Sequence, residues 1–144
     1  MPRVDFYILQ ANNSRDHFVC VLANKIWKEG HTVYICVSSP EDAEAMDNLL
    51  WTFKDISFLP HAIFNPENEE GNFVYIGWQS VPEKNIDVLI NLSDEFPLQV
   101  DKFARIIEIV GENEPDKTHA RKRYKQYRDM GYELKDHQIE KQIG

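Results

Sequence analysis

Short apolar runs divide the chain at regular intervals, and five of them have the length and composition of buried strands. They are Arg3–Leu9, His31–Val37, Phe73–Gly77, Asp87–Leu92 and Phe103–Val110. Strands that are apolar on both faces are typical of a parallel sheet covered by helices on each side. The pattern therefore predicts about five strands in a mostly parallel, twisted sheet, with a short helical turn at Phe96–Gln99.

Three longer segments between these strands carry apolar residues at helical spacing. They run from Asn13 or Ser14 to Gly30, over Pro40–Lys54 and over Pro115–Met130. Ser39 is a favourable cap for the second helix, and Gly131 suits the left-handed position that ends the third. The alternation of strands and helices predicts an α/β fold with three layers, α/β/α.

The chain length predicts a single domain over residues 1–144, because 144 residues is an ordinary size for one compact unit. The segment 135–144 is mostly polar, which predicts a frayed tail. No apolar run is long enough to span a membrane or to form a secretory signal. Two cysteines, Cys20 and Cys36, are too few for a disulfide framework, and we expect a cytoplasmic protein.

The charge of the chain is negative overall but positive in one place. A net charge of -8 argues against a protein that binds nucleic acid over its whole surface. The segment Lys117–Arg128 holds six Lys and Arg and no acid, so the rest of the chain, at -8 less these six, carries -14. A local basic element on an acidic body favours a small anionic ligand, such as an acidic peptide or a short piece of nucleic acid. A solvated helix face is the alternative interpretation.

The sequence lacks the common signatures of catalysis and cofactor binding. The turn after the first predicted strand, QANNSRD, contains no glycine, although a dinucleotide site needs glycine there. The phosphate-binding lysine loop and the nucleophile elbow are also missing, and the histidines and cysteines have no zinc spacing. We therefore expect no catalytic residue, no metal and no cofactor. A small-molecule enzyme built on this α/β fold remains the alternative.

The last predicted helix presents cations and one aromatic ring in a stripe about 60° wide. The stripe consists of Lys117, Arg121, Tyr124 and Arg128. The helix would bury Ala120 and Tyr127, while Val110 and Leu134, just past its two ends, could close an apolar pocket. Guanidinium groups attract carboxylates, and the ring of Tyr124 offers an apolar platform. The alternative is that Tyr124 is a core residue with its hydroxyl at the surface.

A second candidate surface lies on the helix predicted over Pro40–Lys54. Trp51 falls about 110° from the centre of the apolar face of this helix, and Phe58 follows in a predicted loop. An exposed tryptophan is a preferred anchor of protein interfaces. The alternative is that the loop folds back and covers Trp51.

Six sequence blocks, taken together and in order, resemble the chi subunit of bacterial DNA polymerase III. The blocks are FYIL, LANKIWKEGHTVYICV, DNLLWTF, SFLPH, DVLINLS and ARKRYKQYRDMGYEL. The resemblance runs from Phe6 to Leu134, which is nearly the whole chain. The sequence departs from the family pattern in its acidic loop, NPENEEG, and in lacking a late tryptophan.

The resemblance implies a non-catalytic accessory subunit that joins two parts of the replication machinery. One surface would bind the psi subunit, which ties chi to the clamp loader; the family's psi-facing residues carry over onto Trp51 and Phe58. The other surface would grip the acidic C-terminal tail of the single-stranded DNA-binding protein, which ends in aspartates followed by Ile-Pro-Phe. The family's tail-binding residues carry over onto Lys117, Arg121, Tyr124, Val110, Gly131 and Leu134, to which the stripe adds Arg128. A repair helicase that replaces psi around Trp51 is also implied.

We interpret the basic helix as the site that tethers this tail, so that contact with nucleic acid is mainly indirect. The alternative is direct nucleic-acid binding by the same helix. Phosphates would then replace the aspartates, and a base would stack on Tyr124.

Overall fold

The computed structural model describes residues 3–10, 13–53, 59–65, 67, 74–78, 82 and 86–139. Over these residues the chain forms one sheet of seven strands in the order β3-β4-β2-β5-β6-β1-β7, and its six pairings are all parallel. The predicted α/β fold with a mostly parallel sheet is confirmed, with seven strands in place of five. No helix in these described ranges is long and apolar enough to cross a bilayer.

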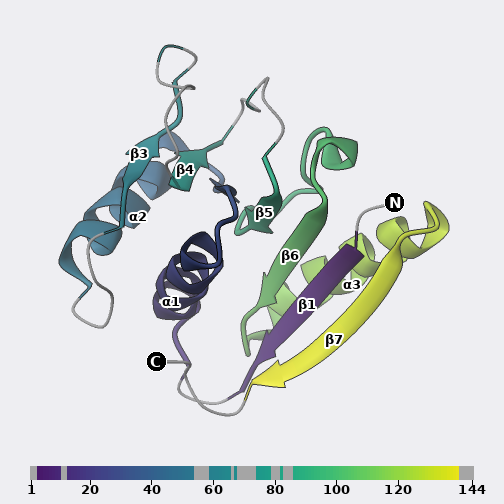
Figure 1. The fold of residues 1–144 in the computed structure, drawn as a ribbon. Coiled ribbons are helices and arrows are strands. Elements are labelled where there is room, and N and C mark those ends of the chain that lie inside the picture. The colour runs from purple at the N-terminus through teal and green to yellow at the C-terminus, as the bar shows by residue number, and fades with distance from the viewer. Residues whose placement is uncertain are drawn as a thin grey trace.

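Strands and helices alternate along most of the chain (Figure 1). The strands are β1 (Arg3–Leu9), β2 (Val33–Cys36), β3 (His61–Ile63), β4 (Val74–Gly77), β5 (Val88–Asn91), β6 (Arg105–Val110) and β7 (Glu133–Ile139). The α-helices are α1 (Arg15–Lys28), α2 (Pro40–Thr52) and α3 (Glu114–Asp129), and η2 (Val100–Lys102) is a short 3₁₀ helix. Five of these strands match the five predicted runs.

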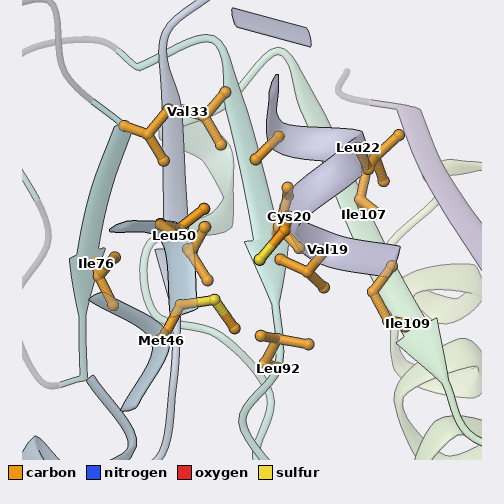
Figure 2. Close-up of a cluster of buried hydrophobic side chains, with 14 of the residues drawn as sticks. Val19, Cys20, Leu22, Val33, Met46, Leu50, Ile76, Leu92, Ile107 and Ile109 are labelled. Atoms are coloured by element: carbon orange, nitrogen blue, oxygen red, sulfur yellow. The ribbon is translucent and has the colours of Figure 1, made fainter. Parts of the chain in front are cut away.

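Helices cover both faces of the sheet. Helices α1 and α2 lie on one face and α3 lies on the other (Figure 1). Under α1 and α2 the core is mostly aliphatic, and Figure 2 shows Val19 and Leu50 within it. The core under α3 is richer in aromatic residues. Because side chains alternate along a strand, β1 serves both cores: Phe6 packs on the α3 side and Leu9 on the α1 side.

Ser39 and Gly131 mark helix ends as the sequence predicts. The hydroxyl of Ser39 accepts a hydrogen bond of 3.2 Å from the backbone N–H of Asp42 and starts α2. Gly131 follows α3 with a φ of 86°, a conformation that glycine adopts without steric cost. Helix α3 begins one residue before the predicted Pro115, because the side chain of Asn113 caps it.

The predicted frayed tail over 135–144 is wrong for its first half. Residues up to Ile139 belong to β7, which pairs in parallel with β1 along the full length of both strands; residues 140–144 lie outside the described residues. Strand β7 is at the edge of the sheet, and an edge strand tolerates polar side chains. A polar edge strand lacks the apolar run from which the other strands were predicted.

The structure also contains one strand that the sequence did not predict, and it shifts one predicted helical turn. Strand β3 is three residues long, too short to give a pattern. The helical turn predicted at Phe96–Gln99 is wrong, because the 3₁₀ helix forms just after it, at η2. Gln99 precedes η2 with a φ of 50°, a left-handed backbone conformation that interrupts a helical turn.

A buried carboxylate helps to hold β7 in the sheet. Asp5 of β1 is inaccessible to solvent and accepts hydrogen bonds from Arg105 at 2.6 Å and from His137 of β7 at 2.8 Å. Burial alone would raise the pKa of Asp5, but these hydrogen bonds and the charges of Arg105 and Arg3 lower it below the ordinary value of 3.8. The ring of Tyr7 stacks on His137 at 4.6 Å. Polar contacts therefore add to the packing of Leu134 and Ile139 in attaching this strand to the sheet.

Candidate functional site

Four cations of α3 face a groove of about 460 Å³ between this helix and the sheet. The sheet contributes Phe6 and Ile8 of β1, Val110 of β6 and Asp136 of β7. The helix contributes Lys117, Ala120, Arg121, Tyr124, Lys125 and Arg128. The predicted stripe of three cations and one ring therefore faces a single hollow.

Strand register explains why the floor of the groove is apolar. Ile8 of β1 pairs with Val110 of β6, so their side chains lie next to each other on the same face of the sheet. Phe6, two residues before Ile8, points to the same side and pairs with Asp136 of β7. The carboxylate of Asp136 thus stands at the edge of an apolar floor.

Tyr124 is half-buried, and its ring belongs both to the core and to the groove. Its centroid is 5.1 Å from that of Phe6, with the two planes tilted by 55°. Such tilted aromatic pairs are favourable and restrict the position of each ring. The interpretation of Tyr124 as a core residue is thus partly right, but the ring still lines the groove.

The groove is strongly positive. Lys117, Arg121, Lys125 and Arg128 line it, against one acidic lining residue, Asp136. Arg128 forms an ion pair of 3.7 Å with its neighbour Asp129, and both side chains are 61% exposed. Among the described residues, the other three cations have no ion-pair partner within 4.0 Å. An anionic ligand would therefore meet cations that are not already neutralised.

A buried ion pair fixes the rotation of α3 above the sheet. Arg123 donates a hydrogen bond of 2.9 Å to Glu108 of β6, and Tyr127 donates one of 2.8 Å to the other carboxylate oxygen. Asn91 also donates to Glu108, at 3.0 Å. Burial and the nearby Glu108 carboxylate raise the pKa of Tyr127. With Arg123 and Tyr127 held beneath the helix, the stripe of cations must face the groove.

Five of the seven residues predicted for the basic site line the groove. Gly131 and Leu134 do not: Gly131 ends α3, and Leu134 lies on β7 against the core on the α3 side. Sequence reasoning missed the sheet residues Phe6, Ile8 and Asp136, and also Lys125 on the helix. The alternation of side chains along β1 would have placed Phe6 and Ile8 on one face.

The second predicted surface contains an exposed tryptophan. Trp51, near the end of α2, is 59% exposed. Its ring lies against the buried His61 of β3, with 4.5 Å between the ring centroids. The other predicted residue of this surface, Phe58, lies outside the described residues.

An ion pair joins the start of α1, which follows β1, to the start of α3, which follows β6. Arg15 of α1 lies 3.2 Å from Asp116 of α3 and donates a hydrogen bond of 2.7 Å to the carbonyl of Leu92. In the described ranges no cluster of three or more His, Cys, Asp or Glu side chains is suited to hold a metal.

Comparisons with known proteins agree on one family. The sequence model described as "DNA polymerase III chi subunit, HolC" matches residues 1–135. The chain is 34% identical to the DNA polymerase III subunit chi of Pseudomonas aeruginosa over 141 residues, which is 96% of this chain and 98% of that protein. It is 30% identical to the Escherichia coli subunit chi over 141 residues, covering 93% of this chain and 96% of that protein.

Solved structures with low sequence identity show the same kind of fold. The crystal structure of T4 UvsW matches with a TM-score of 0.67 and 8% identity, over 96% of this chain and 41% of that one. The C-terminal domain of the DEAD-box protein Dbp5 matches with a TM-score of 0.57 and 12% identity, over 94% of this chain and 90% of that one. At these identities the likeness concerns the fold alone.

Proposed function

Because this chain belongs to the family of DNA polymerase III chi subunits, we propose that it links the clamp loader to single-stranded DNA-binding protein within the polymerase III complex. The psi subunit would form the connection to the clamp loader. The acidic C-terminal tail of the single-stranded DNA-binding protein would occupy the groove beside α3. In this role the chain is a non-catalytic subunit that works in the cytoplasm without a cofactor.

The observation that carries the proposal is the composition of the groove. Four cations surround the ring of Tyr124 above an apolar floor of Phe6 and Ile8. A tail of aspartates that ends in phenylalanine has the complementary composition. The cavity of about 460 Å³ has room for a phenylalanine side chain with adjoining backbone.

In the proposed binding mode the aspartates lie along Lys117, Arg121 and Arg128. The terminal phenylalanine packs on Tyr124 and the floor, and its carboxylate lies near Arg121. Exposed ion pairs contribute ~0–1 kcal/mol each, and burying a phenylalanine contributes about 1.5–3 kcal/mol. After the cost of ordering the tail, a micromolar affinity is expected, about -8 kcal/mol. Several tails on an oligomeric partner would strengthen attachment by effective concentration.

A peptide that ends in Asp-Asp-Asp-Ile-Pro-Phe is expected to bind, and the same peptide without its phenylalanine to bind at least about tenfold more weakly. The expected loss is the burial energy of the ring. Fluorescence anisotropy measures the affinities of the two peptides at two salt concentrations. Binding should weaken as the salt concentration rises, because the aspartate contacts are exposed. A matched single-stranded oligonucleotide is the control. If it binds more tightly than the peptide, direct nucleic-acid binding is the better account of the groove.

For the psi subunit we propose the surface around Trp51 and Phe58. The support for this surface is the exposure of Trp51 at the end of α2, on the opposite side of the sheet from the groove. Partners bound on opposite faces of the sheet would not compete for space. A repair helicase that takes the place of psi would use the same surface.

A further inference from the structure

One residue of the groove does not fit a site made only for anions. Asp136 is the acidic member among the described lining residues, and its side chain is exposed. It projects from β7 beside Phe6, across the groove from the cations of α3. In the described parts of the chain it has no ion-pair partner within 4.0 Å. Its charge therefore acts on whatever enters the groove.

The position of Asp136 is fixed by the two residues that follow it. The next residue, His137, is bonded to the buried Asp5 at 2.8 Å. Gln138 accepts a hydrogen bond of 2.6 Å from Gln10. Because β7 is held in register with β1, the carboxylate cannot be carried away from the groove by a shift of the strand.

The groove is consequently positive along α3 and negative at the edge formed by β7. A peptide whose carboxylates contact α3 turns its other side towards Asp136. A carboxylate on that side would be repelled, whereas an uncharged residue would not.

We propose that Asp136 is a specificity-determining residue, which excludes an acidic side chain from the tail position two residues before the terminal phenylalanine. This inference rests on the proposed function, since it concerns the register of the same tail. The carboxylate of Asp136 restricts the acidic residues of the tail to the part that lies along α3. It also requires an uncharged residue where the tail crosses from α3 to the strands.

The test compares two peptides that differ only in one charge. In the tail peptide, the isoleucine two residues before the terminal phenylalanine is replaced by Gln in one version and by Glu in the other. The Kd of the Glu peptide divided by the Kd of the Gln peptide reports the electrostatic penalty at that position, because the two side chains have the same shape. Asp136→Asn is expected to lower this ratio by about threefold, which is the effect of two charges ~6 Å apart in water.

Glu133→Gln is the matched control. Glu133 is also exposed on β7, but an odd number of residues from Asp136, so it lies on the other face of the sheet. It changes the net charge equally and should leave the ratio unchanged. An unchanged ratio in Asp136→Asn, or an equal change in Glu133→Gln, would overturn this inference and leave the proposed function standing. If the unsubstituted protein binds no tail peptide, the proposed function falls and this inference falls with it.

Discussion

Arg121→Ala is expected to weaken binding of the acidic, phenylalanine-ended tail by about tenfold, since it removes two exposed charged contacts at once, each worth up to ~1 kcal/mol. Arg121 lies in the middle of the basic stripe and next to the ring of Tyr124 along the groove. There it can contact both the last aspartates and the terminal carboxylate. Anisotropy titration of the tail peptide measures the loss.

Lys122→Ala provides the control for the Arg121 variant. Lys122 is the next residue on α3 and is exposed, but it does not line the groove. Removing it changes the net charge by the same amount and should alter the affinity by less than about twofold. Equal losses in the two variants would mean that the tail responds to overall charge, and the groove would no longer be a specific site.

Arg123→Met is expected to lower the free energy of unfolding by about 3–5 kcal/mol, because it leaves the Glu108 carboxylate buried without its cation. Glu108 is inaccessible to solvent, and Arg123 is 6% exposed. Urea denaturation measures the loss. The neighbouring Lys122→Met, on the exposed face, should cost less than about 0.5 kcal/mol.

The pH dependence of this destabilisation identifies its cause. Burial already raises the pKa of Glu108 above its ordinary value of 4.5, against the effect of Arg123, and losing Arg123 raises it further. An acid with a raised pKa binds its proton more tightly in the folded state, so stability is lost as pH rises. The defect of Arg123→Met should therefore shrink as pH falls. A constant defect, or no recovery in the double variant with Glu108→Met, would contradict a buried-charge origin.

Much of the fold could be predicted because the strands are buried on both faces. The limits of β1 were predicted to the residue, since an apolar run with polar ends leaves little choice of boundary. Ser39 and Gly131 marked helix ends because the side-chain cap of Ser39 and the backbone conformation of Gly131 are local features. Local patterns of this kind do not depend on distant parts of the chain.

The remaining features depend on contacts between distant residues. Strand β7 was missed because His137 is attached through Asp5, which lies 132 positions away. Arg123 was read as part of a basic segment, although its partner is the buried Glu108 on β6. For the same reason the helix half of the groove could be predicted from spacing, whereas Asp136 on the opposite wall could not.

The most direct test of the account is a crossed titration of two variants against two partners, the tail peptide and the psi subunit. We expect Arg121→Ala to lose tail binding and keep psi, and Trp51→Ala to keep the tail and lose psi by about thirtyfold or more, as for a tryptophan that anchors an interface. Isothermal titration calorimetry measures all four affinities. Loss of both partners in one variant, or tail binding that survives in Arg121→Ala but fails in Trp51→Ala, would contradict a tail site in the groove beside α3.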